Sequence, residues 1–304
     1  MILSPLFATD ALSGGVSVDF ERASLELGRL DAWSTRQPDV AAQVTGFAST
    51  DPAISRALTA LDWGLLQLRN GFPLSARLLR GVHGKLLNAP LAPLSSSASE
   101  GMDALERWMN DVPERTPPLM KAAVAVAHFT SLQPFPTENG RMAQLLVPLI
   151  FCADGALREP SLYLLRALAS GRGEFDEPLA TREETGRWEP WLALFASLVT
   201  ETSTDAMRTA EALDRLLTSD RERIRAAGRP TTSTLAVFDA LCARPIDKAP
   251  LLAERTGLTL PTVNAALERL QTLGIVDEIT GKRRNRTYRY SAYILRLSEG
   301  TEPL

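Results

Sequence analysis

Apolar residues recur at three- and four-residue spacing along most of this chain, and alternating β-branched runs are scarce before residue 275. This spacing places apolar side chains on one face of an α-helix, so it predicts a mainly α fold. Breakers such as Gly71-Phe72-Pro73, Pro117-Pro118 and Gly155 separate the periodic stretches. We expect helices over residues 19–33, 51–68, 75–87, 98–110, 118–131, 139–156, 160–170, 189–198 and 204–227.

The pattern changes after Gly228-Arg229-Pro230, which breaks the last of these helices. Three shorter amphipathic stretches and two β-like runs follow, and the β-like runs bracket a basic turn. The three helices are expected over residues 231–243, 247–256 and 260–273, and the β-like runs over residues 275–280 and 286–290. Helix, helix, turn, helix and hairpin together predict a small winged helix-turn-helix domain.

Composition narrows the class of protein without naming a function. The chain has 304 residues, of which 45% are hydrophobic and 23% charged, with a net charge of -3. This suits one large globular domain plus a small one, and the overall charge does not indicate a nucleic-acid binder. The apolar run from Leu145 to Ala153 is too short to span a bilayer, so no membrane partner is expected. We interpret Cys152 and Cys242 as free thiols and the protein as cytoplasmic.

Charge along the small domain is uneven. A basic cluster lies on the expected wing, where it could meet phosphates from the edge of a groove, and comprises Lys282, Arg283, Arg284, Arg286 and Arg289. On the third helix, Thr262, Asn264 and Arg269 are interpreted as polar residues near the exposed face, and Thr262 and Asn264 could contact base edges of DNA. Ala265, Leu267 and Leu270 are interpreted as core. The alternative is a protein-interaction module whose wing is solvated or packs on the main domain.

A loop in the large domain carries the strongest chemical signal. It reads Gln133-Pro134-Phe135-Pro136-Thr137-Glu138-Asn139-Gly140-Arg141 and leads into a helix. A glycine-containing turn at a helix N-terminus points backbone N–H groups and the positive end of the helix dipole at an anion. An arginine one turn into the helix can clamp phosphate oxygens. The pattern is therefore typical of phosphoryl-group chemistry.

This loop resembles the active-site motif of the Fic (fido) family, His-Pro-Phe-x-(Asp or Glu)-Gly-Asn-Gly-Arg-x-x-Arg. Residues 121–130, 145–165, 188–191 and 281–286 are also similar to the family, and the resemblance covers roughly residues 20–296. It implies a Fic-type helical domain followed by a winged helix-turn-helix domain. The expected divisions are an N-terminal helical region over 1–70, a Fic core over 71–200, a linker helix over 201–228 and the winged helix over 229–304.

The residues on which the family's adenylyl transfer depends are replaced. Gln133 stands at the position of the general-base histidine, and Thr137 at that of the metal-binding carboxylate. Glu138 replaces a glycine, and Gln144 replaces the second arginine. The loss of a general base alone typically lowers a rate by about 10²- to 10⁴-fold. No confident catalytic residue remains, and no metal site is expected.

Asn139, Gly140 and Arg141 match the motif. Two interpretations stay open for them: residual anion binding, or helix capping by Asn139 with Arg141 paired to Glu138. His128, on the helix before the loop, is interpreted as a core or cap residue, and His83 offers no rescue for the missing base. The connection from residue 88 to 97 leaves no room for the β-hairpin flap that the family uses to dock its targets.

Three functions follow from these replacements. The first is a DNA-binding regulator or scaffold, with a homodimer as a second expected assembly. The second is an enzyme of altered chemistry in which Glu138 or His128 is recruited as acid or base. The third is residual protein adenylyl transfer. No cofactor is certain, and the candidate ligand is ATP or another phosphate-containing molecule held without a strong Mg²⁺ site.

Overall fold

The computed structural model describes residues 14–36, 52–91, 94, 96–111, 116–160, 163, 167, 176–228, 231–282 and 285–299. Helices dominate these ranges and the strands are short, so the predicted mainly α class is confirmed. The chain divides into two compact units between Met207 and Arg208. Over the described ranges, no helix combines the length and the apolar character that crossing a membrane requires.

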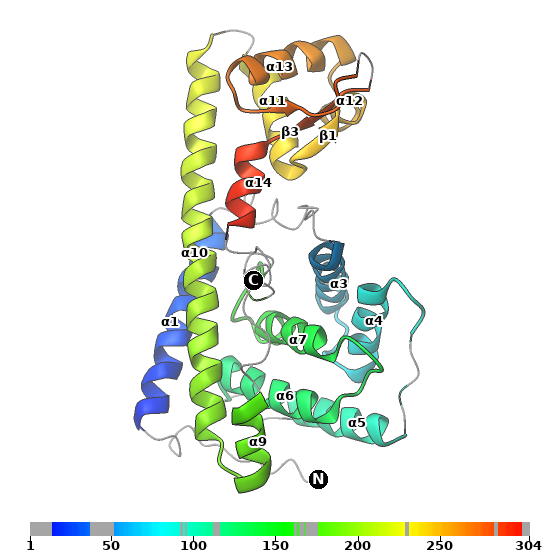
Figure 1. Cartoon of the computed structure of the whole chain (residues 1–304), viewed down its shortest axis with the longest axis vertical. Helices are drawn as coiled ribbons and strands as arrows, with labels where there is room; N and C mark the ends of the chain where they lie inside the picture. The colour runs from blue at the N-terminus through cyan, green and yellow to red at the C-terminus, as the bar shows by residue number, and fades with distance from the viewer. Residues whose placement is uncertain are drawn as a thin grey trace. The chain divides into compact units, whose positions relative to one another are not determined.

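The first unit consists of helices (Figure 1). They are α1 (Gly14–Arg36), α3 (Pro52–Arg69), α4 (Ala76–Leu87), α5 (Ser96–Asp111), α6 (Pro118–Leu132), α7 (Asn139–Ala153), α9 (Asp176–Thr185) and the first half of α10 (Glu189–Ala226). Helices α6 and α7 pack side by side, α3 packs on α4 and α7, and α5 packs on α6.

Helix α6 is the central element of the first unit. Every residue from Ala122 to Ala127 is buried, as expected for a helix that is apolar on all faces. The indole N–H of the fully buried Trp191 donates a 2.9 Å hydrogen bond to the carbonyl of Ala123, which fixes the start of α10 against α6. The motif loop therefore follows a helix that is held firmly in the core.

Helix α4 has defined caps at both ends. The Ser75 hydroxyl accepts a hydrogen bond from the backbone N–H of Leu78, which satisfies a donor that would otherwise lack a partner. At the other end Asn88 adopts the left-handed conformation, and the N–H of Ala89 bonds to the carbonyl of Gly84 at 2.9 Å. The predicted helix over residues 75–87 is thus confirmed, with Ser75 as its N-cap.

The second unit begins in the second half of α10 and joins helices to a small sheet (Figure 1). Its other elements are α11 (Thr231–Ala243), β1 (Ile246–Lys248), α12 (Ala249–Thr256), α13 (Leu260–Thr272), β2 (Asp277–Glu278), β3 (Thr287–Arg289) and α14 (Ser291–Ser298). Helix α11 packs on α12 and α13. The strands are antiparallel in the order β1-β3-β2, and Tyr288 of β3 lies opposite both Asp247 and Glu278.

A buried hydrogen bond joins α10 to the sheet within the second unit. The Tyr290 hydroxyl donates to the Asp220 carboxylate at 2.6 Å, and both residues are buried. Burial raises the pKa of Tyr290 far above its usual value, and the neighbouring Asp220 carboxylate adds to the shift. Tyr290 therefore stays protonated as a donor, and Arg223 pairs with the same carboxylate at 2.6 Å.

Two expected helices, over residues 189–198 and 204–227, are one continuous helix, α10, so the predicted break between them is wrong. Residues 199–203 are rich in Thr and Ser, which are weak helix formers. Burial of the apolar side chains of Phe195, Ala196 and Val199 outweighs that weak preference. In addition, the Thr200 and Thr204 hydroxyls bond to carbonyls one turn earlier, which satisfies these polar groups inside the helix.

The helix predicted over residues 247–256 begins later than expected, at Ala249. Residues 246–248 are instead strand β1, because they pair with β3. Strands β2 and β3 are shorter than the predicted runs, and α9 and α14 were not predicted. The helix expected over residues 160–170 lies outside the described residues except at positions 160, 163 and 167. The expected divisions at residues 70, 200 and 228 stay predictions.

Candidate functional site

The motif loop connects α6 to α7 through two residues in the left-handed conformation. Gln133 has φ 44° and ends α6 with an N–H bond to the Phe129 carbonyl at 3.1 Å. Glu138 has φ 62° and ψ 19° and is the N-cap of α7. Side chains are strained in this region by about 1–2 kcal/mol, whereas glycine is not. Glu138 therefore keeps a backbone conformation suited to glycine, the residue that the resemblance expects at this position.

The side chain of Asn139 holds the loop closed. Its amide Nδ2 donates to the Phe135 carbonyl at 2.6 Å, and its Oδ1 accepts from the Phe135 N–H at 3.0 Å. Asn139 is the first residue of α7, so the expectation that its side chain caps the helix is wrong. Its amide is used instead to close the turn, which brings Phe135 into the core with 4% of its surface exposed.

A histidine from another helix, α4, also holds the motif loop in place. His83 of α4 is 1% exposed and stacks on Phe135, with ring centroids 4.1 Å apart and planes 6° from parallel. Its Nε2 lies 3.1 Å from the carbonyl oxygen of Thr137, so this nitrogen carries the proton and donates. The sequence analysis set His83 aside as a replacement base because it lies on another helix than the loop. Its place on the buried face of α4 was the only available signal.

The residues at the positions of base and metal ligand do not meet at a reaction centre. The Gln133 side chain folds back and donates to the Thr130 carbonyl at 2.6 Å. Thr137 is exposed, and its side chain takes no part in the contact with His83, which uses the backbone. In the part of the chain that the structure describes, no three His, Cys, Asp or Glu side chains gather as they would around a metal ion.

The Gln144 side chain packs within the first unit. Its amide Nε2 donates to the Ala167 carbonyl at 3.3 Å. The side chain also lines an apolar cavity of about 60 Å³ together with residues of α6 and α10, among them Val126 and Phe195. Gln144 is thus used for packing between helices, and one arginine, Arg141, is left in the first turns of α7.

Arg141 is already paired within the loop. Its Nη1 lies 2.9 Å from Oε2 of Glu138, with 15% of the Arg141 side chain and 34% of the Glu138 side chain exposed. The pairing interpretation of these two residues is therefore seen in the structure. Gly140 is exposed, and nothing lies within 4 Å of the place where a Cβ would stand. The N-terminus of α7 thus has open space above Gly140 and an internal carboxylate on its arginine.

His128 lies on α6 and packs against Trp188, with ring centroids 5.8 Å apart. Burial, together with the nearby Arg182 charge, lowers the pKa of His128 to about 4. The imidazole is therefore neutral near pH 7 and a weak base. The Arg182 guanidinium also lies against Trp188, 5.0 Å from the centre of the ring. It donates a hydrogen bond to the Ser131 hydroxyl at 2.7 Å. Together these contacts hold the end of α6 in place.

Helix α13 is the helix expected to contact DNA bases. Its candidate residues differ in whether their side chains are bonded within the protein. The Thr262 hydroxyl is bonded to the Thr259 hydroxyl at 2.8 Å as part of the helix cap, whereas Asn264 is exposed. Arg269 donates to the Ala227 and Gly228 carbonyls and so ties α13 to the end of α10. Ala265 is exposed, so its assignment to the core is wrong; the buried residues of α13 are Val263, Ala266, Leu267 and Leu270.

The basic wing is described in part. Lys282, Arg286 and Arg289 are exposed, and the Arg286 side chain bonds to the Lys282 carbonyl at 3.1 Å across the turn. The predicted sites Arg283 and Arg284 lie outside the described residues. The described residues of the basic cluster therefore lie on or beside the hairpin of β2 and β3, where the sequence predicted them.

Comparison with known proteins identifies part of the first unit. Residues 65–151 match the model of the Fic/DOC family, a stretch that runs from α3 to α7 and includes the motif loop. Among solved structures, a Fic family protein from Desulfovibrio desulfuricans G20 is similar over 92% of this chain and 97% of that chain. The sequence identity is 13% and the TM-score is 0.46. The family model thus identifies a Fic/DOC family domain within the first unit, and the residues it matches do not reach the second unit.

Proposed function

We propose that this chain is a Fic-type protein that has lost adenylyl transfer and acts as a DNA-binding regulator or scaffold. The observation that carries the proposal is a loop that is well held but lacks reactive groups. Asn139, Phe135 and His83 keep its shape, while Gln133 bonds to a carbonyl. General-base transfer needs a group that accepts a proton, and a glutamine side chain cannot do so. A loop that is firmly held but lacks the reactive groups favours binding over catalysis.

The charge of the second unit supports the DNA-binding half of the proposal. Helix α13 follows α12 and a short turn, and its exposed Asn264 is suited to contact base edges. The exposed Lys282 and Arg286 are suited to neutralise phosphates from the hairpin. A helix-turn-helix pair with an adjacent basic hairpin is the arrangement of a winged helix-turn-helix.

Binding to a labelled fragment from upstream of the protein's own coding sequence tests this half. We expect anisotropy to rise at low salt and the affinity to fall steeply with added salt, because each phosphate contact contributes a slope of about 0.9. The double variant Lys282→Glu/Arg286→Glu should bind at least about tenfold more weakly and with a shallower slope. The double variant Arg215→Glu/Arg225→Glu, which makes the same change of charge at exposed positions of α10, is the matched control. No binding at low salt would refute DNA binding.

Adenylyl transfer is tested separately with labelled ATP, Mg²⁺ and cell lysate. The proposal expects no labelled protein band from the native chain. The triple variant Gln133→His/Thr137→Asp/Glu138→Gly restores the residues expected from the family motif, and a band from this variant alone would show that the replaced groups account for the loss. A labelled band from the native chain would contradict the proposal.

The hypothesis of altered chemistry receives less support from the geometry. Glu138 is held by Arg141 at 2.9 Å, so its carboxylate is engaged and not free to take a proton from a substrate. His128 packs on Trp188 with its pKa lowered to about 4, which makes it a weak base. Neither group is poised as a replacement base.

A further inference from the structure

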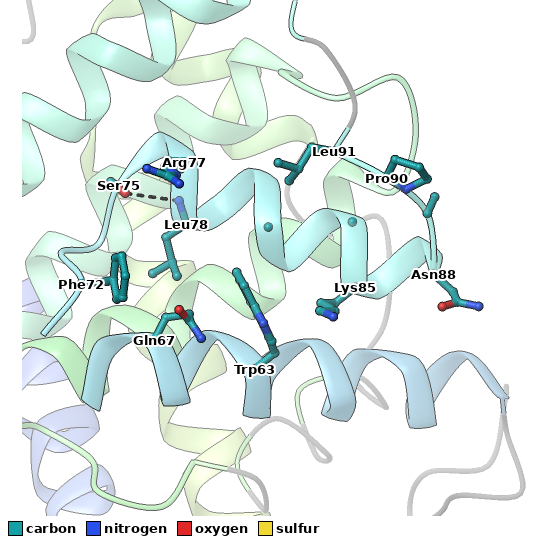
Figure 2. A pocket seen from close by; sticks show the side chains of 13 residues that line it. Trp63, Gln67, Phe72, Ser75, Arg77, Leu78, Lys85, Asn88, Pro90 and Leu91 are labelled. Atoms are coloured by element: carbon teal, nitrogen blue, oxygen red, sulfur yellow. Dashed lines mark hydrogen bonds between the residues drawn. The ribbon is translucent and has the colours of Figure 1, made fainter. Parts of the chain in front are cut away.

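A groove crosses the exposed face of α4, away from the motif loop. It encloses about 610 Å³ and is lined by α3, by α4 and by the residues that follow α4 (Figure 2). Its lining residues all lie between Trp63 and Leu91 and include none of the loop residues 133–141. The groove is therefore a separate feature from the candidate anion site, and it does not depend on the proposed binding of DNA.

Two glycines of α4 let neighbouring groups of the groove wall pack directly against the helix backbone. A Cβ on Gly81 would stand 2.3 Å from Cη2 and 2.5 Å from Cζ3 of Trp63, so only glycine lets the indole lie against α4. A Cβ on Gly84 would stand 3.0 Å from the Ala89 carbonyl oxygen. Glycine costs helix stability of about 1 kcal/mol relative to alanine, and its use here allows close approach to the helix backbone.

The walls of the groove are apolar and partly exposed. Figure 2 shows Trp63 rising from α3 toward α4, between Leu78 and Lys85. Phe72 stands at one end of the groove with 51% of its surface exposed, and Leu91 at the other side of α4 with 53% exposed. Exposed large apolar side chains that gather around one hollow are typical of an interaction surface.

Cations flank the apolar section. Arg77 and Lys85 are both exposed, and both line the groove. They are eight residues apart on α4, which corresponds to about 12 Å along the helix axis. The Lys85 ammonium lies 5.9 Å from the centre of the Trp63 ring, within the range of a cation–π contact. With their backbone positions about 12 Å apart, the two cations fit two separate anionic groups with an apolar group between them.

We propose that this groove docks a helical segment of a partner protein that carries two carboxylates about two turns apart and a bulky apolar side chain between them. Side chains eight positions apart on the partner helix have the same spacing of about 12 Å as Arg77 and Lys85. The apolar side chain lies against the Trp63 indole, which itself fills the space beside Gly81, and the carboxylates pair with Arg77 and Lys85. Recognition of an amphipathic helix in a groove supplies the apolar contact, and the charges set its orientation.

Fluorescence anisotropy with a defined probe tests the proposal on the full chain. The probe is a fluorescein-labelled, alanine-rich helical peptide with two glutamates eight positions apart and a leucine midway; its partner probe has lysines in place of the glutamates. We expect the glutamate peptide to bind and the lysine peptide to bind much more weakly. Lys85→Glu should lower affinity for the glutamate peptide by about five- to thirtyfold and raise affinity for the lysine peptide.

Control variants separate the groove from the general charge of the chain. Arg56→Glu makes the same change of charge on an exposed position of α3 outside the groove, and should leave the affinity nearly unchanged. Gly81→Ala should also weaken binding, since its Cβ displaces Trp63, and circular dichroism will show whether the helices are kept. The proposal is overturned if the glutamate peptide does not bind at low salt, if Lys85→Glu binds it equally well, or if ATP displaces it from the groove.

Discussion

Replacing Glu138 with glutamine should strengthen anion binding at the N-terminus of α7. The substitution keeps the size and the backbone conformation of the side chain but removes the negative charge 2.9 Å from Nη1 of Arg141. Glutamine is preferred to glycine for this purpose, because glycine would also relieve the strain of the left-handed conformation and add freedom to the unfolded chain. Only the competition between the internal carboxylate and an external anion changes.

The magnitude follows from the exposure of the pair. Two unit charges 4 Å apart interact by about 4 kcal/mol at an effective dielectric of 20 and by about 1 kcal/mol in water. Since 34% of the Glu138 side chain is exposed, the lower value is the appropriate one. A change of about 1 kcal/mol corresponds to an affinity about fivefold higher. Screening by salt should reduce this gain.

Titration calorimetry with inorganic phosphate at low ionic strength measures the effect. We expect Glu138→Gln to bind phosphate about fivefold more tightly than the native chain, and Glu138→Gln/Arg141→Gln to lose the gain. Glu184→Gln, an exposed carboxylate on α9, is the matched control for net charge. Equal affinity for phosphate in the native chain and Glu138→Gln, or no binding by either, would refute the assignment of this loop as an anion site.

Three further predictions concern stability. Asn139→Ala removes two hydrogen bonds that close the loop and should lower the free energy of unfolding by about 2 kcal/mol in urea denaturation; a change below about 0.5 kcal/mol would contradict that role. Tyr290→Phe leaves the buried Asp220 carboxylate without its phenol donor and should cost about 2 kcal/mol, with the far-ultraviolet spectrum unchanged. Because the pKa of His128 is lowered to about 4, its contribution to the free energy of unfolding is present above about pH 6.5 and is lost as the pH falls toward 4. His128→Gln should therefore lose less stability than the native chain as the pH falls. Asp62 has the opposite dependence, because burial and Glu159 raise its pKa to about 6. Its contribution to the free energy of unfolding is lost as the pH rises through 6.

Local signals predicted the helices well where the apolar periodicity was clear. The range predicted from residues 75–87 agrees with α4, and the range predicted from residues 260–273 agrees with α13, which ends at Thr272. The break expected between residues 198 and 204 was wrong, because the burial of Phe195, Ala196 and Val199 is a tertiary effect that local preference does not contain. Strand β1 was missed for the same reason, since its pairing partner lies some forty residues away in β3.

The site was predictable as far as its motif reached. The loop residues and the Glu138–Arg141 pair lie close together in sequence, and their spacing indicated both the turn and the pair. His83 and the new role of Asn139 were not predicted, because both depend on which backbone atoms the folded loop presents. Arg269 appeared free on α13, but its contacts to the Ala227 and Gly228 carbonyls depend on how α10 ends.

The division of labour in the motif loop has an evolutionary consequence. The groups that hold it, His83, Phe135 and Asn139, are distinct from the groups at the reactive positions, Gln133 and Thr137, whose residues are exposed. Substitutions at the reactive positions therefore leave the support of the loop intact. A lineage could lose the chemistry by drift while selection on stability preserved the scaffold, and the same separation keeps a return to chemistry open through changes at the surface.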